Sequence, residues 1–141
     1  MSRVAGWWKL LSWKQKYDDG RVVNPFGDEP VGRLTYSDAG DFSVLISRPD
    51  KPHFTTGSQW NAEDHEKAKA YDGIMTYFGH YELSGETMSH HVEASSFPNW
   101  EGHTQTRTAV IEDDFMTLSA RLEESTSEAR TVELIWQRIA S

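Results

Sequence analysis

Apolar and polar residues alternate along short segments of the chain, and turn-forming residues separate these segments. Side chains of a β-strand point alternately to the two faces of its sheet, so a period of two predicts strands with one apolar face. The predicted strands are residues 5–17, 31–37, 41–48, 74–83, 86–95, 103–112, 115–122 and 130–139. Closure removes the unpaired edges of consecutive antiparallel strands. We therefore expect an all-β fold, an up-and-down antiparallel barrel of about eight strands.

One segment, residues 61–72, has the features of a short helix. Asn61 is a good N-cap, and Glu63 and Glu66 suit the positive end of a helix dipole. The apolar stripe of this segment is weak. We expect the helix either to cover or plug one end of the barrel, or to be a simple crossover between two strands.

The first predicted strand is rich in tryptophan. A helix is a competing interpretation for this segment, because several of its apolar residues also fit a period of 3.6, but the neighbouring β pattern favours a strand. Alternation places Trp8 and Leu10 on one face, and Trp7 and Trp13 on the other. Trp7 and Trp13 are therefore expected on the outside of the barrel, where they would suit a homodimer contact.

The length, net charge and composition of the chain exclude several classes of protein. A chain of 141 residues has the usual length of a single domain, here residues 1–141. The net charge of −8 argues against a nucleic-acid-binding surface, and no apolar run approaches the roughly 20 residues that span a membrane. No signal peptide is recognisable at the start. The absence of cysteine excludes disulfides and thiolate sites. It also favours a reducing compartment, so we expect a cytoplasmic protein.

The clearest hairpin joins residues 74–83 to residues 86–95. A loop at Ser84 and Gly85 would pair Gly79 with His90, and the apolar faces of the two arms would then coincide. His90 would point into the barrel between Tyr77 and Tyr81, with room in front of it at Gly79.

Two other strands carry polar side chains whose direction matters. Arg138 shares a face with Trp136, and a buried arginine needs a partner, for which stacking on a tryptophan is suitable. Gln105 and Arg107 share a face of the strand at 103–112, but neither face of that strand is plainly apolar. Its orientation stays open from the pattern alone.

Several segments resemble a known family. Gly6-Trp7-Trp8 is similar to the Gly-x-Trp of the first lipocalin strand, and Arg138 to the last-strand arginine that packs over that tryptophan. The whole chain resembles the small bacterial and fungal lipocalin-like domain family. The matching segments are residues 6–12, 30–36, 42–49, 77–81, 90–93, 98–102, 105–107 and 136–138. The resemblance implies a lipocalin-like barrel around an internal ligand cavity, with Gln105 and Arg107 inward. It transfers no catalytic residue.

The inward polar side chains suggest two sets of site residues. The candidate catalytic residues are His90, Tyr77, Tyr81 and Arg107. The candidate ligand-binding residues are Trp8, Tyr36, Gln105, Trp100, Trp136 and Arg138. Histidine exchanges protons near neutral pH, tyrosine orients or protonates an oxygen, and arginine stabilises an enolate or carboxylate. This chemistry suits a small oxygenated apolar molecule.

The sequence supports two main hypotheses of function. The first is a cofactor-independent isomerase, cyclase or dehydratase of secondary metabolism with His90 as acid and base. The second is a non-catalytic carrier or sensor of a small hydrophobic ligand, and a purely structural role for the polar side chains also stays open. We expect no cofactor and no metal, because His90 and His91 diverge and no metal-ligand spacing or dinucleotide motif occurs.

Overall fold

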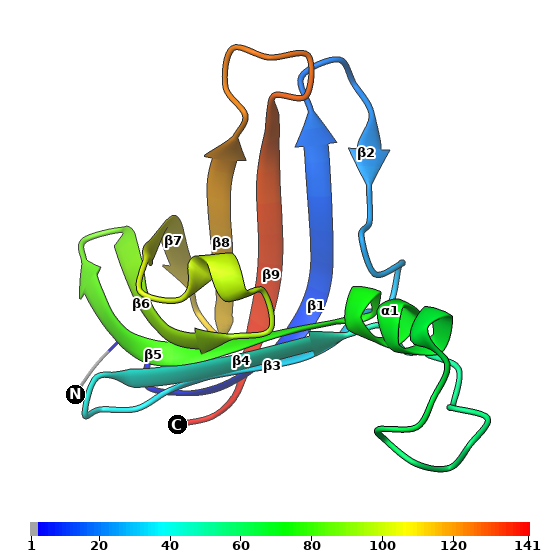
Figure 1. Ribbon diagram of the computed structural model, residues 1–141. Coiled ribbons are helices and arrows are strands. Elements are labelled where there is room, and N and C mark those ends of the chain that lie inside the picture. Colours follow the sequence, from blue (N-terminus) through cyan, green and yellow to red (C-terminus); the bar gives the residue numbers. More distant parts are fainter. Residues whose placement is uncertain (1–2) are drawn as a thin grey trace.

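The computed structural model describes residues 3–141, and its elements follow the predicted pattern closely (Figure 1). The strands are β1 (Gly6–Tyr17), β2 (Val22–Val23), β3 (Val31–Tyr36), β4 (Asp41–Ser47), β5 (Ile74–Ser84), β6 (Thr87–Ser95), β7 (Thr104–Glu112), β8 (Phe115–Leu122) and β9 (Arg130–Ala140). The helix α1 spans Asp64–Asp72, and a 3₁₀ turn, η1, spans Pro98–Trp100. All eight predicted strands are therefore confirmed, and the segment before β3 contains the additional two-residue strand β2.

The sheet closes on itself. Each strand from β3 to β8 pairs antiparallel with the next, and β1 pairs with both β3 and β9. Figure 1 shows β1 and β9 side by side although they come from opposite ends of the chain. The short β2 pairs only with Gln15 and Lys16 of β1 and lies outside this ring. The predicted antiparallel eight-stranded barrel is confirmed.

The N-terminal segment and β9 close one end of the barrel. Trp8 is completely buried, and its indole N–H donates to the carbonyl of Val4 at 2.9 Å. The guanidinium of Arg138 lies 4.4 Å from the centre of the Trp8 ring and donates to the carbonyl of Ala5. The predicted stacking of Arg138 on a tryptophan is confirmed, and it joins β9 to the start of the chain.

A β-bulge in β1 corrects one prediction. Leu10 pairs with Trp136 and Ser12 pairs with Ile135, so Leu11 is an extra residue in the ladder. Alternation is therefore reset after Leu11, and Trp13 points into the barrel instead of outward. There it packs edge-on against Phe26, with ring centres 4.9 Å apart.

Only Trp7 keeps the outward position predicted for the two tryptophans. The guanidinium of Arg33 lies over its ring at 4.0 Å. A homodimer contact at Trp7 stays a prediction.

The register of the β5–β6 hairpin also differs from the prediction. Ser84 pairs with Thr87, so the loop is Gly85 and Glu86, and the pairs from this loop as far as Gly79 move by two residues. Gly85 has a φ of 60°, the left-handed conformation that favours glycine in such turns. Because the shift is two residues, the apolar faces still coincide.

The role predicted for Gly79 was wrong. Gly79 pairs with Val92 instead of His90, next to a register shift between Phe78 and Gly79. A Cβ atom at Gly79 would lie 1.8 Å from the carbonyl oxygen of His91. The absent side chain therefore makes room for the backbone of β6 and not for the ring of His90.

The helix begins later than predicted and does not plug the barrel. Its N-cap is Glu63 instead of Asn61, and the Glu66 carboxylate accepts the backbone N–H groups of Glu63 and Thr55. No residue of α1 is buried, and the helix lies beside the barrel as part of the β4–β5 connection (Figure 1). None of the helices within residues 3–141 is long and apolar enough to cross a membrane.

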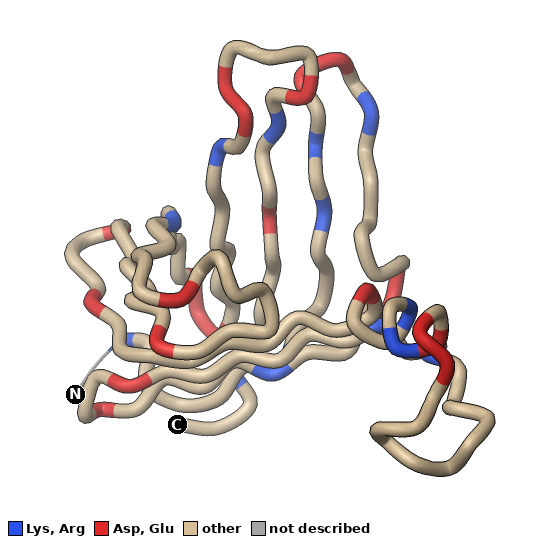
Figure 2. The backbone as a smooth tube through the Cα atoms, viewed as in Figure 1, with Lys and Arg blue, Asp and Glu red and all other residues tan. Residues whose placement is uncertain are grey.

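Charged side chains gather at one end of the barrel. Figure 2 shows acidic and basic residues on the β1–β2 and β8–β9 turns, which meet there. Arg121 on β8 forms ion pairs with Asp18 and Glu124, and Arg21 bridges the two turns through Glu128. These ion pairs fasten the first turn of the chain to the last one.

Candidate functional site

A largely enclosed cavity of about 150 Å³ lies inside the barrel. All eight strands of the ring contribute to its wall, and η1 adds Trp100. The wall is mostly apolar. Its aromatic and polar members are Trp13, Gln15, Tyr77, His90, Trp100, Arg107 and Trp136, and its aliphatic members are Leu34, Val44, Ile46, Met75, Leu118, Leu122, Val132 and Leu134.

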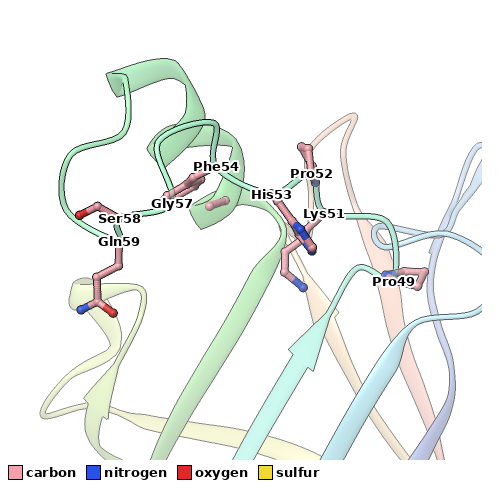
Figure 3. Close-up of a pocket in the computed structure, with 9 residues that line it drawn as sticks. Pro49, Lys51, Pro52, His53, Phe54, Gly57, Ser58 and Gln59 are labelled. Atoms are coloured by element: carbon pink, nitrogen blue, oxygen red, sulfur yellow. The ribbon is translucent and has the colours of Figure 1, made fainter.

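A larger hollow of about 640 Å³ is a less suitable site. It is an open depression formed almost entirely by the β4–α1 connection, residues 49–59. Figure 3 shows its side chains strung out along this one loop, and they do not converge on a common point. A small-molecule site is normally concave and has a few convergent polar groups, so the cavity in the barrel is the better candidate.

His90 is the most buried polar residue of the cavity wall. It lies on β6, where alternation turns it inward, and only 2% of its surface is exposed. Its ring stacks on Phe42, with centres 4.3 Å apart and planes 18° apart. Its Nε2 atom lies 2.6 Å from the hydroxyl oxygen of Tyr36. The ring is therefore held in one orientation by a hydrogen bond and an aromatic stack.

Burial keeps both members of the Tyr36–His90 pair uncharged. Burial, together with the smaller effect of the nearby Arg107 cation, lowers the pKa of His90 to about 3. Burial also raises the pKa of the Tyr36 phenol well above its usual value. The phenol hydrogen has no other acceptor within residues 3–141, so we assign the phenol as the donor to Nε2, and the neutral imidazole then carries its proton on Nδ1. Within residues 3–141, no protein acceptor reaches this buried Nδ1.

Arg107 brings a permanent positive charge to the cavity. It lies on the inward face of β7, so the orientation that the pattern left open is now known. Its guanidinium donates to the side-chain oxygen of Gln105 and to the carbonyl of Thr106, both at 3.0 Å. No carboxylate within residues 3–141 forms an ion pair with Arg107. Its charge is therefore balanced only by neutral oxygen atoms.

Tyr77 completes the polar part of the wall. Burial raises the pKa of its phenol, and the positive charge of Arg107 opposes this shift. The edge of Trp100 packs against the Tyr77 ring, with centres 5.3 Å apart. The η1 turn therefore brings Trp100 to the wall next to Tyr77.

The structure divides the residues suggested by the sequence into three groups. Those that line the cavity are Tyr77, His90, Trp100, Arg107 and Trp136. Tyr36 and Gln105 stand behind His90 and Arg107, to which they are hydrogen-bonded. Trp8, Arg138 and Tyr81 are not in the wall: the first two close the far end of the barrel, and the Tyr81 hydroxyl donates to the carbonyl of Ser37 at 2.7 Å.

Sequence reasoning missed two polar or aromatic members of the wall. Trp13 and Gln15 line the cavity because the bulge at Leu11 turns them inward. The uniform alternation assumed for this strand assigned Trp13 to the opposite face. The only available signal was the clustering of apolar residues at 10, 11 and 13, which interrupts the period of two.

The arrangement is better suited to hydrogen bonding than to proton transfer. A general acid or base works best when its pKa lies near the operating pH, and His90 is far below that range. Within residues 3–141, no group of three or more His, Asp or Glu side chains could hold a metal ion. The wall offers aromatic surface together with a few polar groups that fix orientation.

Comparison with known proteins agrees with this architecture. A family model described as a lipocalin-like domain matches residues 5–139. The chain belongs to this lipocalin-like family. A curated relative is the 4′-hydroxy-3′-methoxypropiophenone carrier protein ppsC of Aspergillus oryzae, which is 33% identical over 85 residues. The alignment covers 55% of the lipocalin-like chain and 77% of the relative. The family resemblance inferred from the sequence is confirmed, and family and relative together support the binding of a small molecule.

Proposed function

We propose that this lipocalin-like protein binds a small oxygenated molecule with a single aromatic ring and carries it without altering it. The cavity inside the barrel carries this proposal. Its volume of about 150 Å³ suits one aromatic ring with small substituents, since an apolar cavity of about this size holds benzene. The ring would pack among Trp13, Trp100 and Trp136.

The name of the relative supports the same class of ligand. That protein is named as a carrier of 4′-hydroxy-3′-methoxypropiophenone, an aromatic ketone with one ring. The ketone has both the ring and the oxygen atoms that the cavity would accommodate. We propose it as the first probe and not as the physiological ligand.

The state of His90 favours carriage over catalysis. A histidine whose pKa is about 3 is almost fully deprotonated at neutral pH, so it has no proton to give as a general acid. It is also a weak base, because its conjugate acid is destabilised by burial. It can still orient an oxygen atom through the N–H at Nδ1.

A cofactor-independent isomerase, cyclase or dehydratase of secondary metabolism is the second candidate. The observation in its favour is that His90, Tyr77 and Arg107 line one cavity. A bound substrate with a developing negative charge would raise the pKa of His90 and make it a better base.

Calorimetric titration with 4′-hydroxy-3′-methoxypropiophenone tests the proposal. We expect saturable binding, and Leu118→Phe, which fills the cavity, should weaken it at least about tenfold. Leu45→Phe makes the same change on the exposed outer face of β4 and should leave the affinity unchanged. Val44→Leu adds a single methylene to the wall and serves if Leu118→Phe does not fold.

The fate of the ligand separates the two candidates. After prolonged incubation with an equimolar amount of protein, chromatography and mass spectrometry should recover the ketone unchanged. Conversion that His90→Phe abolishes would favour the enzyme. Absence of binding at millimolar ligand would contradict binding of this ketone in the cavity. Equal binding by Leu118→Phe and Leu45→Phe would contradict it as well.

A further inference from the structure

The residues around the cavity supply hydrogen-bond donors and few free acceptors. Four buried side-chain atoms within residues 3–141 have no hydrogen-bond partner, and three of them belong to cavity residues: Nε1 of Trp13, Nε1 of Trp136 and Nδ1 of His90. An indole nitrogen only donates, and the tautomer assigned to His90 from its contact with Tyr36 makes Nδ1 a donor as well. Each of these N–H groups therefore needs an oxygen acceptor that the protein does not supply.

The side-chain amide oxygens near the cavity are already engaged. The side-chain oxygen of Gln15 accepts a hydrogen bond from Arg130 at 2.7 Å. The oxygen of Gln105 accepts one from Arg107, whereas the phenols of Tyr36 and Tyr77 can each accept as well as donate. The residues around the cavity therefore have more unpaired hydrogen-bond donors than unpaired acceptors. A buried donor without an acceptor costs about 1–3 kcal/mol, so a molecule that satisfies these donors gains affinity.

The unsatisfied donors lie on opposite walls. Around the ring of eight strands, β1 and β6 are four strands apart in either direction, so Trp13 and His90 face each other across the barrel. Trp136 lies on β9 beside β1, and Arg107 lies on β7 beside β6. One wall therefore carries two indole N–H groups, and the other carries an imidazole N–H and a guanidinium.

We propose that the cavity selects aromatic molecules with a hydrogen-bond acceptor at each of two opposite ends of the ring, such as a carbonyl oxygen at one end and an ether oxygen at the other. This inference deepens the proposed function and rests on it. Molecules of the same shape with a carbon atom in place of either oxygen leave donors unsatisfied and bind more weakly. Such a site is typically more selective than an apolar pocket, because buried polar groups penalise an analogue that cannot pair with them.

Three para-substituted benzenes of nearly equal shape test this rule. 4′-Methoxyacetophenone has an acceptor at both ends, 4′-ethylacetophenone has only the carbonyl, and 1-ethyl-4-isopropylbenzene has neither. Quenching of tryptophan fluorescence reports binding, because three tryptophans line the cavity. We expect the Kd to rise about tenfold with each acceptor removed.

Variants that lose one donor show whether the protein recognises the oxygen atoms. Trp136→Phe and His90→Phe each remove an N–H and keep an aromatic ring. For two probes that differ in one oxygen atom, the ratio of their Kd values should fall toward one in each variant. The substitution also changes the volume of the cavity, but this change affects both Kd values equally because the probes have the same shape. Trp7→Phe makes the corresponding change on the outside of the barrel and should leave both ratios as they are in the unmodified protein.

The outcomes separate this inference from the function on which it rests. Equal affinity of the unmodified protein for all three probes overturns the acceptor rule and leaves aromatic binding intact. Ratios that persist in both Trp136→Phe and His90→Phe also overturn it. Failure of all three probes to bind overturns the proposed function and this inference together.

Discussion

His90 illustrates how a single polar residue can be accommodated in the interior of the barrel. Its Nε2 atom is satisfied by Tyr36, its ring is stacked on Phe42, and its charge is suppressed by burial. Alternation along β6 was sufficient to predict that it points inward. Its partner Tyr36 was expected to bind the ligand. No local pattern shows that the hydroxyl of Tyr36 on β3 reaches the ring of His90 on β6, three strands away around the barrel.

The depressed pKa of His90 makes the stability of the protein depend on pH. An unfolded histidine has a pKa near 6.5, so between that value and about 3 the unfolded chain binds more protons than the folded one. The stabilisation is complete above pH 6.5 and is lost as the pH falls. We expect the free energy of unfolding to drop by about 2 kcal/mol between pH 7 and pH 5 on account of His90.

Urea denaturation of the unmodified protein and of His90→Phe measures this difference. Every other ionisable residue is the same in the two proteins, so its share cancels in the comparison. The variant should lose about 2 kcal/mol less than the unmodified protein over this interval. Identical pH dependence of the two proteins would show that His90 is not held neutral by the fold.

At the scale of single elements, the bulge in β1 decides which residues reach the cavity. Leu11 has no partner in the β1–β9 ladder, and this allows Trp13 and Gln15 to face inward while Lys14 and Lys16 face outward. The eight strands themselves could be predicted, because alternation is a local property of the sequence. The bulge could not, because it depends on the register in which the first strand meets the last one.

Two single-residue deletions in β1 should differ strongly in their effect on stability. Deletion of Leu11 removes the extra residue and leaves a regular ladder with Trp13 and Gln15 still inward. Deletion of Lys14 moves every later residue of the strand to the other face and directs Lys16 into the barrel. Thermal unfolding should therefore show a much larger loss for the second deletion. Equal losses would contradict the assigned role of the bulge.

At the scale of the whole molecule, closure depends on contacts between the two ends of the chain. Arg138 on β9 covers Trp8 on β1 and donates to the carbonyl of Ala5. The sequence identified this pair through the family resemblance. It offered no means of seeing the ion pairs of Arg121 and Arg21 at the other end, because they join turns that are about a hundred residues apart.

Replacement of Arg138 by alanine should weaken this closure. We expect a loss of about 2 kcal/mol in the free energy of unfolding, because a cation–π contact and a hydrogen bond to the backbone disappear together. Arg33→Ala is the matched control, since Arg33 lies over Trp7 on the outside of the barrel. It should cost less than about 1 kcal/mol, as exposed contacts of this kind do. Similar losses in urea denaturation would argue against a special role for Arg138.

The pairing of β1 with β9 also has a consequence for the synthesis of the protein. The first strand of the ring to leave the ribosome has to wait for the last, because its longest ladder forms with β9. Until then the nascent chain carries two open sheet edges and exposes the tryptophan-rich face of β1. Such edges can pair with other chains. The nascent chain is therefore most prone to aggregation before β9 is translated, and molecular chaperones would be most useful to it in that interval.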